Sequence, residues 1–383
     1  MATKNNDKTL NVPHLRFPEF SGEWKETTLG KIAEITKGSG ISKDQLSEQG
    51  SPCILYGELY TKYKSEIINE VYSRTELDSS PLVKSKANDV IIPCSGETAI
   101  DISTARCVLF NNILLGGDLN IIRLKYDDGG FFAYQLNGAR KKDIARVAQG
   151  VSVVHLYGEN LKHIRVYHPA IEEQKKIARL LSLIDERITT QNKIIEKLES
   201  LIRGIYKTLL GESDQYRYLD ELCEIKKGVQ VNKEKLSEKG LYYVMNGGIT
   251  PSGYYDLYNT EANTISISEG GNSCGYVQYN YTPFWSGGHC YTLENISNVV
   301  DNRYLFHYLK ANELQIMSLR IGSGLPNIQK KDLSAFRIPL PALNKQINIA
   351  KALDALLYKI TVDKNIYSTY KQQKEYLLQQ MFI

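Results

Sequence analysis

A long stretch of regularly spaced apolar residues constrains the fold of this chain more than any other feature. After Pro169 the sequence contains no Pro or Gly until Gly204, and its apolar residues recur at alternating steps of four and three. The positions on this grid include Ile177, Leu181, Ile184, Ile188, Ile195, Leu198 and Ile202. A sustained repeat of 3.5 residues with charges between is typical of a long helix that packs along another helix. The pattern therefore predicts a long helix with a helical partner.

The partner is predicted at the C-terminus, because the pattern returns there. Residues 341–346 (PALNKQ) match residues 169–174 (PAIEEQ) at a shift of 172. The shifted grid includes Leu353, Leu356, Ile360, Tyr367 and Leu377. A second similarity relates residues 29–38 (LGKIAEITKG) to residues 219–228 (LDELCEIKKG) at a shift of 190. These two similarities predict an internal duplication in which the second globular segment is 18 residues shorter than the first.

The duplication divides the chain into five parts. We expect an N-terminal arm (1–28), a globular segment (29–170), a central long helix (171–210), a second globular segment (211–342) and a C-terminal long helix (343–383). β-branched runs bounded by turn residues predict strands at 53–56, 89–93, 107–110 and 119–124, and at 242–244, 264–267 and 276–279. Helices are expected at 131–148 and 302–319. The fold class is therefore α+β, with two similar globular α/β segments, two long antiparallel coiled-coil helices and an approximate two-fold symmetry.

Composition excludes several classes of protein. The net charge of +4 is small, so a nucleic-acid surface would have to come from local clusters of Lys and Arg. The six cysteines form no C-x-x-C pair, which argues against a zinc site and for reduced thiols. The sequence has no signal-peptide pattern and no apolar run long enough to span a bilayer. We therefore expect a cytoplasmic protein with no metal and no membrane contact.

Motifs of enzymes are missing as well. The Gly30-Lys31 dipeptide is followed by Ile32, where a phosphate-binding loop needs Ser or Thr. The Asn/Asp-Pro-Pro-aromatic motif of amino-methyltransferases is absent, since no two prolines are adjacent. The six histidines form no metal-binding array, and His155 and His168 are expected to finish turns. We predict no catalytic residue, and therefore a chain that is not an enzyme.

Polar loops are the remaining candidates for function, because recognition residues concentrate on loops held by a rigid scaffold. Reading base edges needs Asn, Gln, Ser, Thr, Arg or acidic groups, while Lys and Arg hold phosphates. The candidate DNA-binding residues on these loops are Lys37, Ser39, Lys43, Ser95, Thr98, Ser152, Lys226, Lys227, Gln230, Asn272, Ser273, His289, Ser323 and Asn327. The alternative for each of them is an ordinary solvated loop, which has the same composition.

The order of these motifs resembles a known family, the specificity (S) subunits of Type I restriction-modification systems. The resemblance covers almost the whole chain and is carried by residues 12–20, 29–33, 173–178, 322–328, 338–341 and 377–382. Residues 153–155 (VVH) depart from the Leu-Pro-Asn of the second copy. The resemblance implies that 29–170 and 211–342 are target recognition domains, each reading one half of a bipartite, asymmetric site in double-stranded DNA. The long helices would then set the gap between the halves and dock the partner subunits.

The resemblance also implies the division of labour in the complex. Two modification subunits would methylate adenine with S-adenosylmethionine, and restriction subunits would use ATP and Mg to translocate and cut DNA. The chain itself would need no cofactor. Two other hypotheses remain open at this point: a self-contained DNA methyltransferase with fused recognition domains, and a protein-protein scaffold that does not bind DNA.

Overall fold

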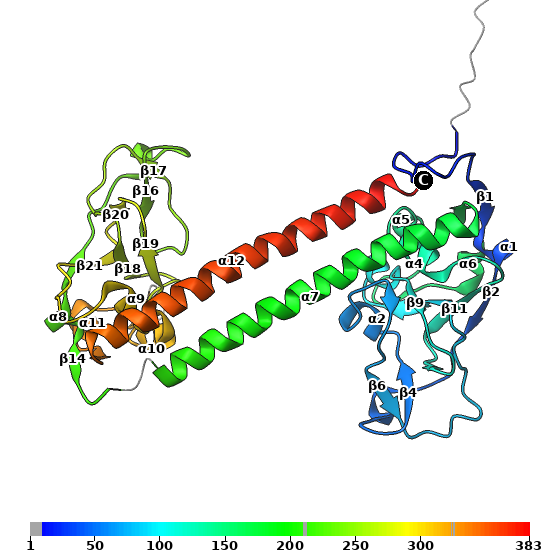
Figure 1. Cartoon of the computed structure of the whole chain (residues 1–383), viewed down its shortest axis with the longest axis horizontal. Coiled ribbons are helices and arrows are strands. Elements are labelled where there is room, and N and C mark those ends of the chain that lie inside the picture. Colours follow the sequence, from blue (N-terminus) through cyan, green and yellow to red (C-terminus); the bar gives the residue numbers. More distant parts are fainter. Residues whose placement is uncertain (1–9, 210–212, 323, 325) are drawn as a thin grey trace, which may run out of the picture. The chain divides into compact units, whose positions relative to one another are not determined.

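The computed structural model describes residues 10–209, 213–322, 324 and 326–383. The chain forms two compact units, which are described separately here: unit 1 comprises Met1–Asn192 and Asn365–Ile383, and unit 2 comprises Lys193–Lys364. Two long helices, α7 (Ile171–Leu209) and α12 (Leu343–Gln380), each contribute one part to unit 1 and the other part to unit 2 (Figure 1).

Unit 1 is built on a five-stranded sheet in the order β2-β11-β7-β9-β5, which is antiparallel except at β5. Its strands are β2 (Ala33–Lys37), β11 (Leu119–Leu124), β7 (Asp89–Pro93), β9 (Arg106–Val108) and β5 (Ile67–Ile68). The smaller sheets contain β10 (Leu114–Leu115), β4 (Ser51–Ile54), β6 (Ser73–Thr75) and β3 (Leu46–Ser47), then β1 (Lys25–Thr28) with β13 (Arg165–His168), and β8 (Ser95–Gly96) with β12 (Val154–His155). The short helices are α1 (Leu29–Ile32), η1 (Lys43–Gln45), α2 (Glu58–Thr61), α3 (Ala99–Ile102), α4 (Gly129–Asn137), α5 (Lys141–Arg146) and α6 (Gly158–Lys162).

Unit 2 repeats this plan with a four-stranded antiparallel sheet in the order β15-β21-β18-β19. Its strands are β15 (Glu224–Lys227), β21 (Cys290–Glu294), β18 (Thr264–Ser268) and β19 (Val277–Asn280). The smaller sheets contain β17 (Tyr254–Tyr255), β16 (Tyr242–Met245) and β20 (Trp285–Ser286), then β14 (Tyr216–Tyr218) with β22 (Arg337–Pro339). The short helices are α8 (Leu219–Leu222), η2 (Lys233–Lys235), α9 (Asn302–Ala311), α10 (Glu313–Ser318) and α11 (Lys330–Ser334). The matching strand orders confirm the predicted α+β fold and its duplication.

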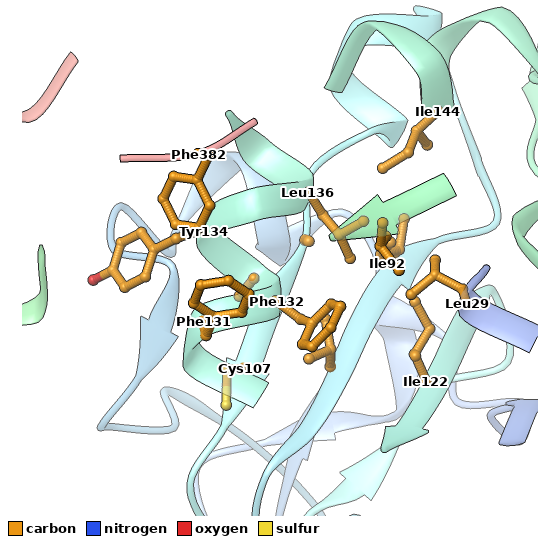
Figure 2. Close-up of a cluster of buried hydrophobic side chains, with 14 of the residues drawn as sticks. Leu29, Ile92, Cys107, Ile122, Phe131, Phe132, Tyr134, Leu136, Ile144 and Phe382 are labelled. Atoms are coloured by element: carbon orange, nitrogen blue, oxygen red, sulfur yellow. The ribbon is translucent and has the colours of Figure 1, made fainter. Parts of the chain in front are cut away.

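The core of unit 1 lies where α4 packs against the central sheet and the end of the chain packs against α4. Phe131, Phe132 and Tyr134 of α4 are fully buried, and Figure 2 shows Phe382 beside them. The ring of Phe382 lies 5.2 Å from that of Phe131 and 6.3 Å from that of Trp24, measured between centroids. The C-terminal residues are therefore part of the hydrophobic core of unit 1.

The N-terminal arm closes the same core. The backbone NH of Leu15 donates to the carbonyl of Gln380 at 2.8 Å, and Trp24 is buried. Arg16 makes a bidentate contact with Glu173 in the first turn of α7, with both N···O distances at 2.7 Å. This arrangement ties the arm to both long helices within unit 1.

In unit 2 the equivalent helix α9 covers the sheet in the same way. Tyr304, Leu305 and Leu309 of α9 are fully buried in one cluster with Ile265 and Ile267 of β18. Parts of both long helices complete this cluster through Ile202, Leu353 and Ile360, with Leu198 and Leu356 half-buried against it. The amphipathic stripe of the sequence thus packs against a globular core in addition to a second helix.

The predicted helix-packing residues lie on buried faces of the long helices. In unit 1, Ile177, Leu181, Ile184 and Leu377 are buried in one cluster, Ile188 is half-buried against it, and Tyr367 is half-buried; in unit 2, Ile195 is buried.

The directions of the two long helices in unit 1 follow from two contacts. Lys374 Nζ lies 2.6 Å from Asp185 Oδ1, and Arg187 donates to the hydroxyl of Tyr370 at 3.3 Å. Residue numbers rise along α7, from Asp185 to Arg187, while those of their partners on α12 fall, from Lys374 to Tyr370. The two helices are therefore antiparallel there.

The repeated glutamine of the PAIEEQ and PALNKQ motifs joins each long helix to its globular part. Gln174 accepts a hydrogen bond from the backbone NH of Asp128 at 2.9 Å and donates to the carbonyl of Pro169 at 2.9 Å. In unit 2, Gln346 accepts from the NH of Asp301 at 2.8 Å and donates to the carbonyl of Pro341 at 2.8 Å. Each Asp is the N-cap of the core helix, α4 or α9. A buried side chain therefore satisfies orphan groups at a helix terminus in both copies.

Two helix predictions were wrong in length. The helix expected at 131–148 is divided into α4 and α5, because Gly138 adopts a non-helical conformation with ψ of −100°. The helix expected at 302–319 is divided into α9 and α10 at Asn312, which ends the first and starts the second. Gly and Asn are the residues that most readily leave helical geometry, so both breaks have a local cause. The sequence patterns also missed the strands β2, β15 and β21.

Candidate nucleic-acid interface

Two Lys-Gly steps, Lys37-Gly38 and Lys227-Gly228, lie at the ends of two equivalent strands, β2 and β15. Lys37 lies opposite Asn120 in the β2-β11 pair, and Lys227 lies opposite Tyr291 in the β15-β21 pair. The following glycines approach the neighbouring backbone so closely that a Cβ on Gly38 or Gly228 would collide with a carbonyl oxygen. Both lysine side chains are exposed. The backbone therefore presents a lysine at the same point of each unit.

Three further segments of unit 1 converge near Lys37. The NH of Cys94 donates to the carbonyl of Asp118 at 2.7 Å, and the NH of Leu156 donates to the carbonyl of Cys94 at 2.7 Å. His155 exchanges two backbone hydrogen bonds with Gln149, at 2.7 and 2.8 Å. Strand β12 also pairs with β8, which places His155 opposite Ser95. We call the group formed by Lys37, Cys94, Asp118 and His155 the first loop junction.

Unit 2 repeats these hydrogen bonds with other residues. The NH of Glu269 donates to the carbonyl of His289 at 2.9 Å, and the NH of Ile328 donates to the carbonyl of Glu269 at 2.8 Å. Asn327 exchanges two backbone hydrogen bonds with Ile321, at 2.8 and 3.0 Å. We call the group formed by Lys227, Glu269, His289 and Asn327 the second loop junction. Position by position, it corresponds to Lys37, Cys94, Asp118 and His155 of the first.

The second loop junction is organised around the carboxylate of Glu269, which is 9% exposed. Lys227 Nζ donates to its Oε1 at 2.7 Å, and His289 Nδ1 lies 3.1 Å from its Oε2. The hydrogen bond that Lys227 donates to Glu269, together with the negative charge of Glu269, raises the pKa of the Lys227 ammonium above its ordinary value. The Lys227 and His289 side chains are 52% and 62% exposed. A buried acid thus holds two exposed nitrogen groups.

The first loop junction has a thiol where the second has a carboxylate. Burial raises the pKa of Cys94 to about 11, and the positive charge of Lys37 opposes this shift only in part. The thiol therefore stays neutral at physiological pH. Lys37 and Asp118 are both exposed, and the His155 ring stacks on the ring of Tyr157 with centroids 6.3 Å apart. The two junctions have the same pattern of backbone hydrogen bonds, but their side chains differ in charge and chemical type.

The structure brings some of the predicted site residues together and separates others. Lys37 and Ser95 belong to the first loop junction or border it, Lys227, His289 and Asn327 belong to the second, and Gln230 lies beside Gly288. Lys43, the first residue of η1, and Ser152 and Asn272, which lie on loops, are exposed and apart from these contacts. Ser273 is half-buried in a turn in which its carbonyl accepts from the NH of Tyr276. Ser323 lies outside the described residues.

Three of the predicted residues have structural partners. The hydroxyl of Ser39 accepts from the NH of Val83 at 2.8 Å, and the hydroxyl of Thr98 caps α3 by accepting from the NH of Asp101 at 3.1 Å. Lys226 pairs with Glu294 at 3.2 Å. These three side chains therefore hold loops or strands in place.

The sequence patterns missed four residues of this interface: Asp118, His155, Asn246 and Glu269. Of these, Asn246 accepts a hydrogen bond from the NH of His289 through its side-chain oxygen at 3.0 Å. The correspondence of His155 with Asn327 was available, since both fit the shift of 172. Glu269 lies between the predicted strands 264–267 and 276–279, but nothing in the sequence distinguishes a buried carboxylate from an exposed one.

The chemistry of both junctions is that of hydrogen bonding and charge. An ammonium, an imidazole and a carboxamide are groups that hold phosphates and contact base edges. Among the described residues, no group of three or more His, Cys, Asp or Glu side chains could hold a metal ion. No helix in the described part of the chain is long and apolar enough to cross a membrane.

Comparisons with known proteins find relatives of both globular segments. The family model described as Type I restriction modification DNA specificity domain matches residues 21–200 and again residues 213–371. A putative type I restriction enzyme specificity subunit of Methanocaldococcus jannaschii is 27% identical over 91% of this chain and 90% of its own length. A putative type I specificity subunit of Mycoplasma pneumoniae is 38% identical over 37% of this chain, and the match spans only 38% of that relative.

A solved structure shares the fold over nearly the whole chain. The crystal structure of a Type I restriction-modification S subunit from M. genitalium aligns with a TM-score of 0.73 at 20% identity, covering 97% of this chain and 99% of that one. The family model matches most of the sequence, in two copies that fall on the two repeats. The chain therefore belongs to the Type I restriction modification DNA specificity domain family and carries this domain twice.

Proposed function

We propose that this chain is the non-catalytic specificity subunit of a Type I restriction-modification complex, and that each loop junction reads one half of a bipartite DNA site. The observation that supports this most is that one backbone arrangement occurs twice with different side chains. Three of the four corresponding positions differ between the junctions: Cys94 and Glu269, Asp118 and His289, His155 and Asn327.

These differences bear on the symmetry of the DNA site. Identical readers related by a two-fold axis would select a palindrome, as symmetric DNA-binding dimers do. Here one junction offers a carboxylate where the other offers an imidazole. We therefore expect two half-sites of unrelated sequence, which is a bipartite and asymmetric target.

The long helices and the partners complete the proposal. Helices α7 and α12 belong to both units, so we expect them to set the number of unspecified base pairs between the halves and to dock two modification subunits. The relatives are named as specificity subunits, which implies partners that carry out methylation and cleavage. We propose that S-adenosylmethionine, ATP and Mg are used by these modification and restriction subunits, that this chain uses no cofactor, and that the complex acts in the cytoplasm.

Methylome sequencing tests the proposal directly. The chain is expressed with the modification subunits of its host, and the methylated positions are mapped over a whole genome. We expect a split motif with two defined halves and a fixed gap. A continuous motif would contradict the proposal. Methylation in the absence of any modification subunit would indicate a self-contained methyltransferase, and failure to bind any duplex with all partners present would indicate a scaffold.

A domain exchange provides the internal control. Replacing residues 29–170 by the corresponding segment of another specificity subunit is expected to change one half of the motif and to leave the other half and the gap unchanged. A change in both halves would show that the two junctions do not read independently.

A further inference from the structure

The imidazole of His289 is held in one orientation by the second loop junction. Both oxygens of Glu269 are occupied, Oε1 by the Lys227 ammonium and Oε2 by His289 Nδ1. An ionised carboxylate can only accept hydrogen bonds, so Nδ1 must carry the proton that it shares with Oε2. In the neutral ring Nε2 is then the acceptor. No described residue hydrogen-bonds Nε2, and the side chain is 62% exposed.

The backbone of His289 is held as firmly as its ring. Its NH donates to Asn246 Oδ1 at 3.0 Å, and its carbonyl accepts from the NH of Glu269 at 2.9 Å. Gly247, with a φ of +80°, lies against the Cβ of His289, where a larger residue would meet it. A side chain fixed before binding loses little freedom when it meets a ligand, which favours selective contacts.

We infer that His289 is a specificity-determining residue of unit 2, and that its Nε2 accepts a hydrogen bond from the exocyclic amino group of a base in the major groove. This inference rests on the proposed function. The groups that qualify are N4 of cytosine and N6 of adenine. Guanine O6 and thymine O4 present acceptors at the same edge, and two facing acceptors repel. His289 therefore selects A or C against G or T at one position of the half-site.

Glu269 acts through His289 and is a positioning residue. The variant Glu269→Gln tests this role, because glutamine has one acceptor oxygen and one donor nitrogen. The Lys227 ammonium can only donate, so it takes the amide oxygen and leaves the amide NH₂ facing His289. The ring must then accept at Nδ1 and carry its proton on Nε2. Nε2 becomes a donor, which suits G or T.

The experiment selects bound sequences from a random DNA library with the full complex of specificity and modification subunits, above about pH 7.5, where imidazoles are mostly neutral. For His289→Ala we expect the preference at one base position in the half-site of unit 2 to fall about 10-fold, within the usual range for a base-edge contact. For Glu269→Gln we expect the preferred base at that position to change from A or C to G or T. The other half-site should stay unchanged in both variants.

The matched control is Glu294→Gln, which removes the same charge from the neighbouring Lys226–Glu294 pair but faces no histidine. It should leave the base preference unchanged. An unaltered motif for His289→Ala would overturn the inference. So would a Glu269→Gln variant that binds all sequences more weakly by the same factor, since Glu269 would then only hold Lys227 against a phosphate.

The outcomes also separate this inference from the proposed function. If the complex that contains the parent chain, without substitutions, selects no split motif, the proposed function fails. If it selects a split motif that neither variant alters, only the role of His289 fails. His289→Gln checks for loss of folding, because it keeps a hydrogen-bonding group on an exposed side chain. This variant should melt at the same temperature as the parent chain and retain part of the discrimination between bases at that position.

Discussion

Replacing Phe382 by Ala tests whether the C-terminal residues hold unit 1 together. Phe382 is 4% exposed, and its ring lies against that of Phe131 (Figure 2) and that of Trp24. Truncating a buried Phe to Ala usually costs about 3–5 kcal/mol. Phe382 lies beyond the last turn of α12, outside regular secondary structure, so the backbone there can relax toward the cavity. We therefore expect a loss at the lower end, about 3 kcal/mol in the free energy of unfolding of unit 1.

Trp24 is a natural probe for this loss, because it touches the mutated ring. The other tryptophan, Trp285, belongs to unit 2 and can be removed as Trp285→Phe, so that the emission reports Trp24 alone. With a urea dependence of about 2 kcal/mol per M, the unfolding midpoint should fall by about 1.5 M.

The control and the refuting result use the same helix. Tyr376 lies on α12 and is 57% exposed, so Tyr376→Ala should change the free energy of unfolding by less than about 0.5 kcal/mol. If Phe382→Ala unfolds at the same urea concentration as the parent, the end of the chain does not contribute to the core. An equal loss in both variants would show that the effect comes from α12 in general.

Three further predictions concern other parts of the fold. Arg16→Ala leaves the buried carboxylate of Glu173 without its partner and should destabilise unit 1 by about 3 kcal/mol; urea unfolding followed by Trp24 emission measures this, and an unchanged midpoint would contradict it. Burial lowers the pKa of His307 below its ordinary 6.5, so its stabilising contribution is present above that value and is lost as the pH falls through the lowered pKa. Thermal melts of unit 2 should therefore fall in temperature below about pH 6.5, and His307→Gln, which can still bond Asp354, should remove this dependence; equal acid sensitivity in both proteins would refute the assignment. Gly204 lies inside α7, where an added Cβ meets nothing within 4 Å, so Gly204→Ala should stabilise the protein by about 0.5–1 kcal/mol in the same urea assay, and destabilisation would show an unseen contact.

The parts of the fold that were predictable are those set by local periodicity. The long helices follow a repeat that runs over about forty residues, and β7 and β11 are short runs rich in Ile, Leu and Val that coincide with the predicted ranges 89–93 and 119–124. The strands β2 and β15 were missed because each carries exposed charged residues and lies at the edge of its sheet. Their pairing with β11 and β21 decides their structure, and pairing is not a local property.

The loop junctions could be predicted only as a collection of loops. Lys227 and Glu269 are 42 residues apart, and Glu269 and His289 are 20 apart. The shift between the copies is 190 for Lys37 and Lys227, 175 for Cys94 and Glu269, and 171 for Asp118 and His289. No single alignment offset therefore reveals the correspondence. It follows from matching backbone hydrogen bonds, which only the folded chain displays.

The hydrogen bonds that Gln174 and Gln346 make to their globular segments have a consequence for how such proteins diversify. The side chains of Gln174 and Gln346 hold their globular parts through the NH of an Asp and the carbonyl of a Pro. These are main-chain groups, as is the carbonyl of Val299, which accepts from Gln346 at 3.1 Å; Gln174 also donates to the side-chain Oδ1 of Asp127 at 2.8 Å. A replacement segment therefore keeps the main-chain contacts if it brings a capped core helix to the same place. These hydrogen bonds therefore depend little on the sequence of the globular segment, and the loops of that segment can vary without breaking them. On the proposed function, we expect recombination at the starts of α7 and α12 to replace one globular segment at a time, and so to change one half of the DNA target while the two long helices stay the same.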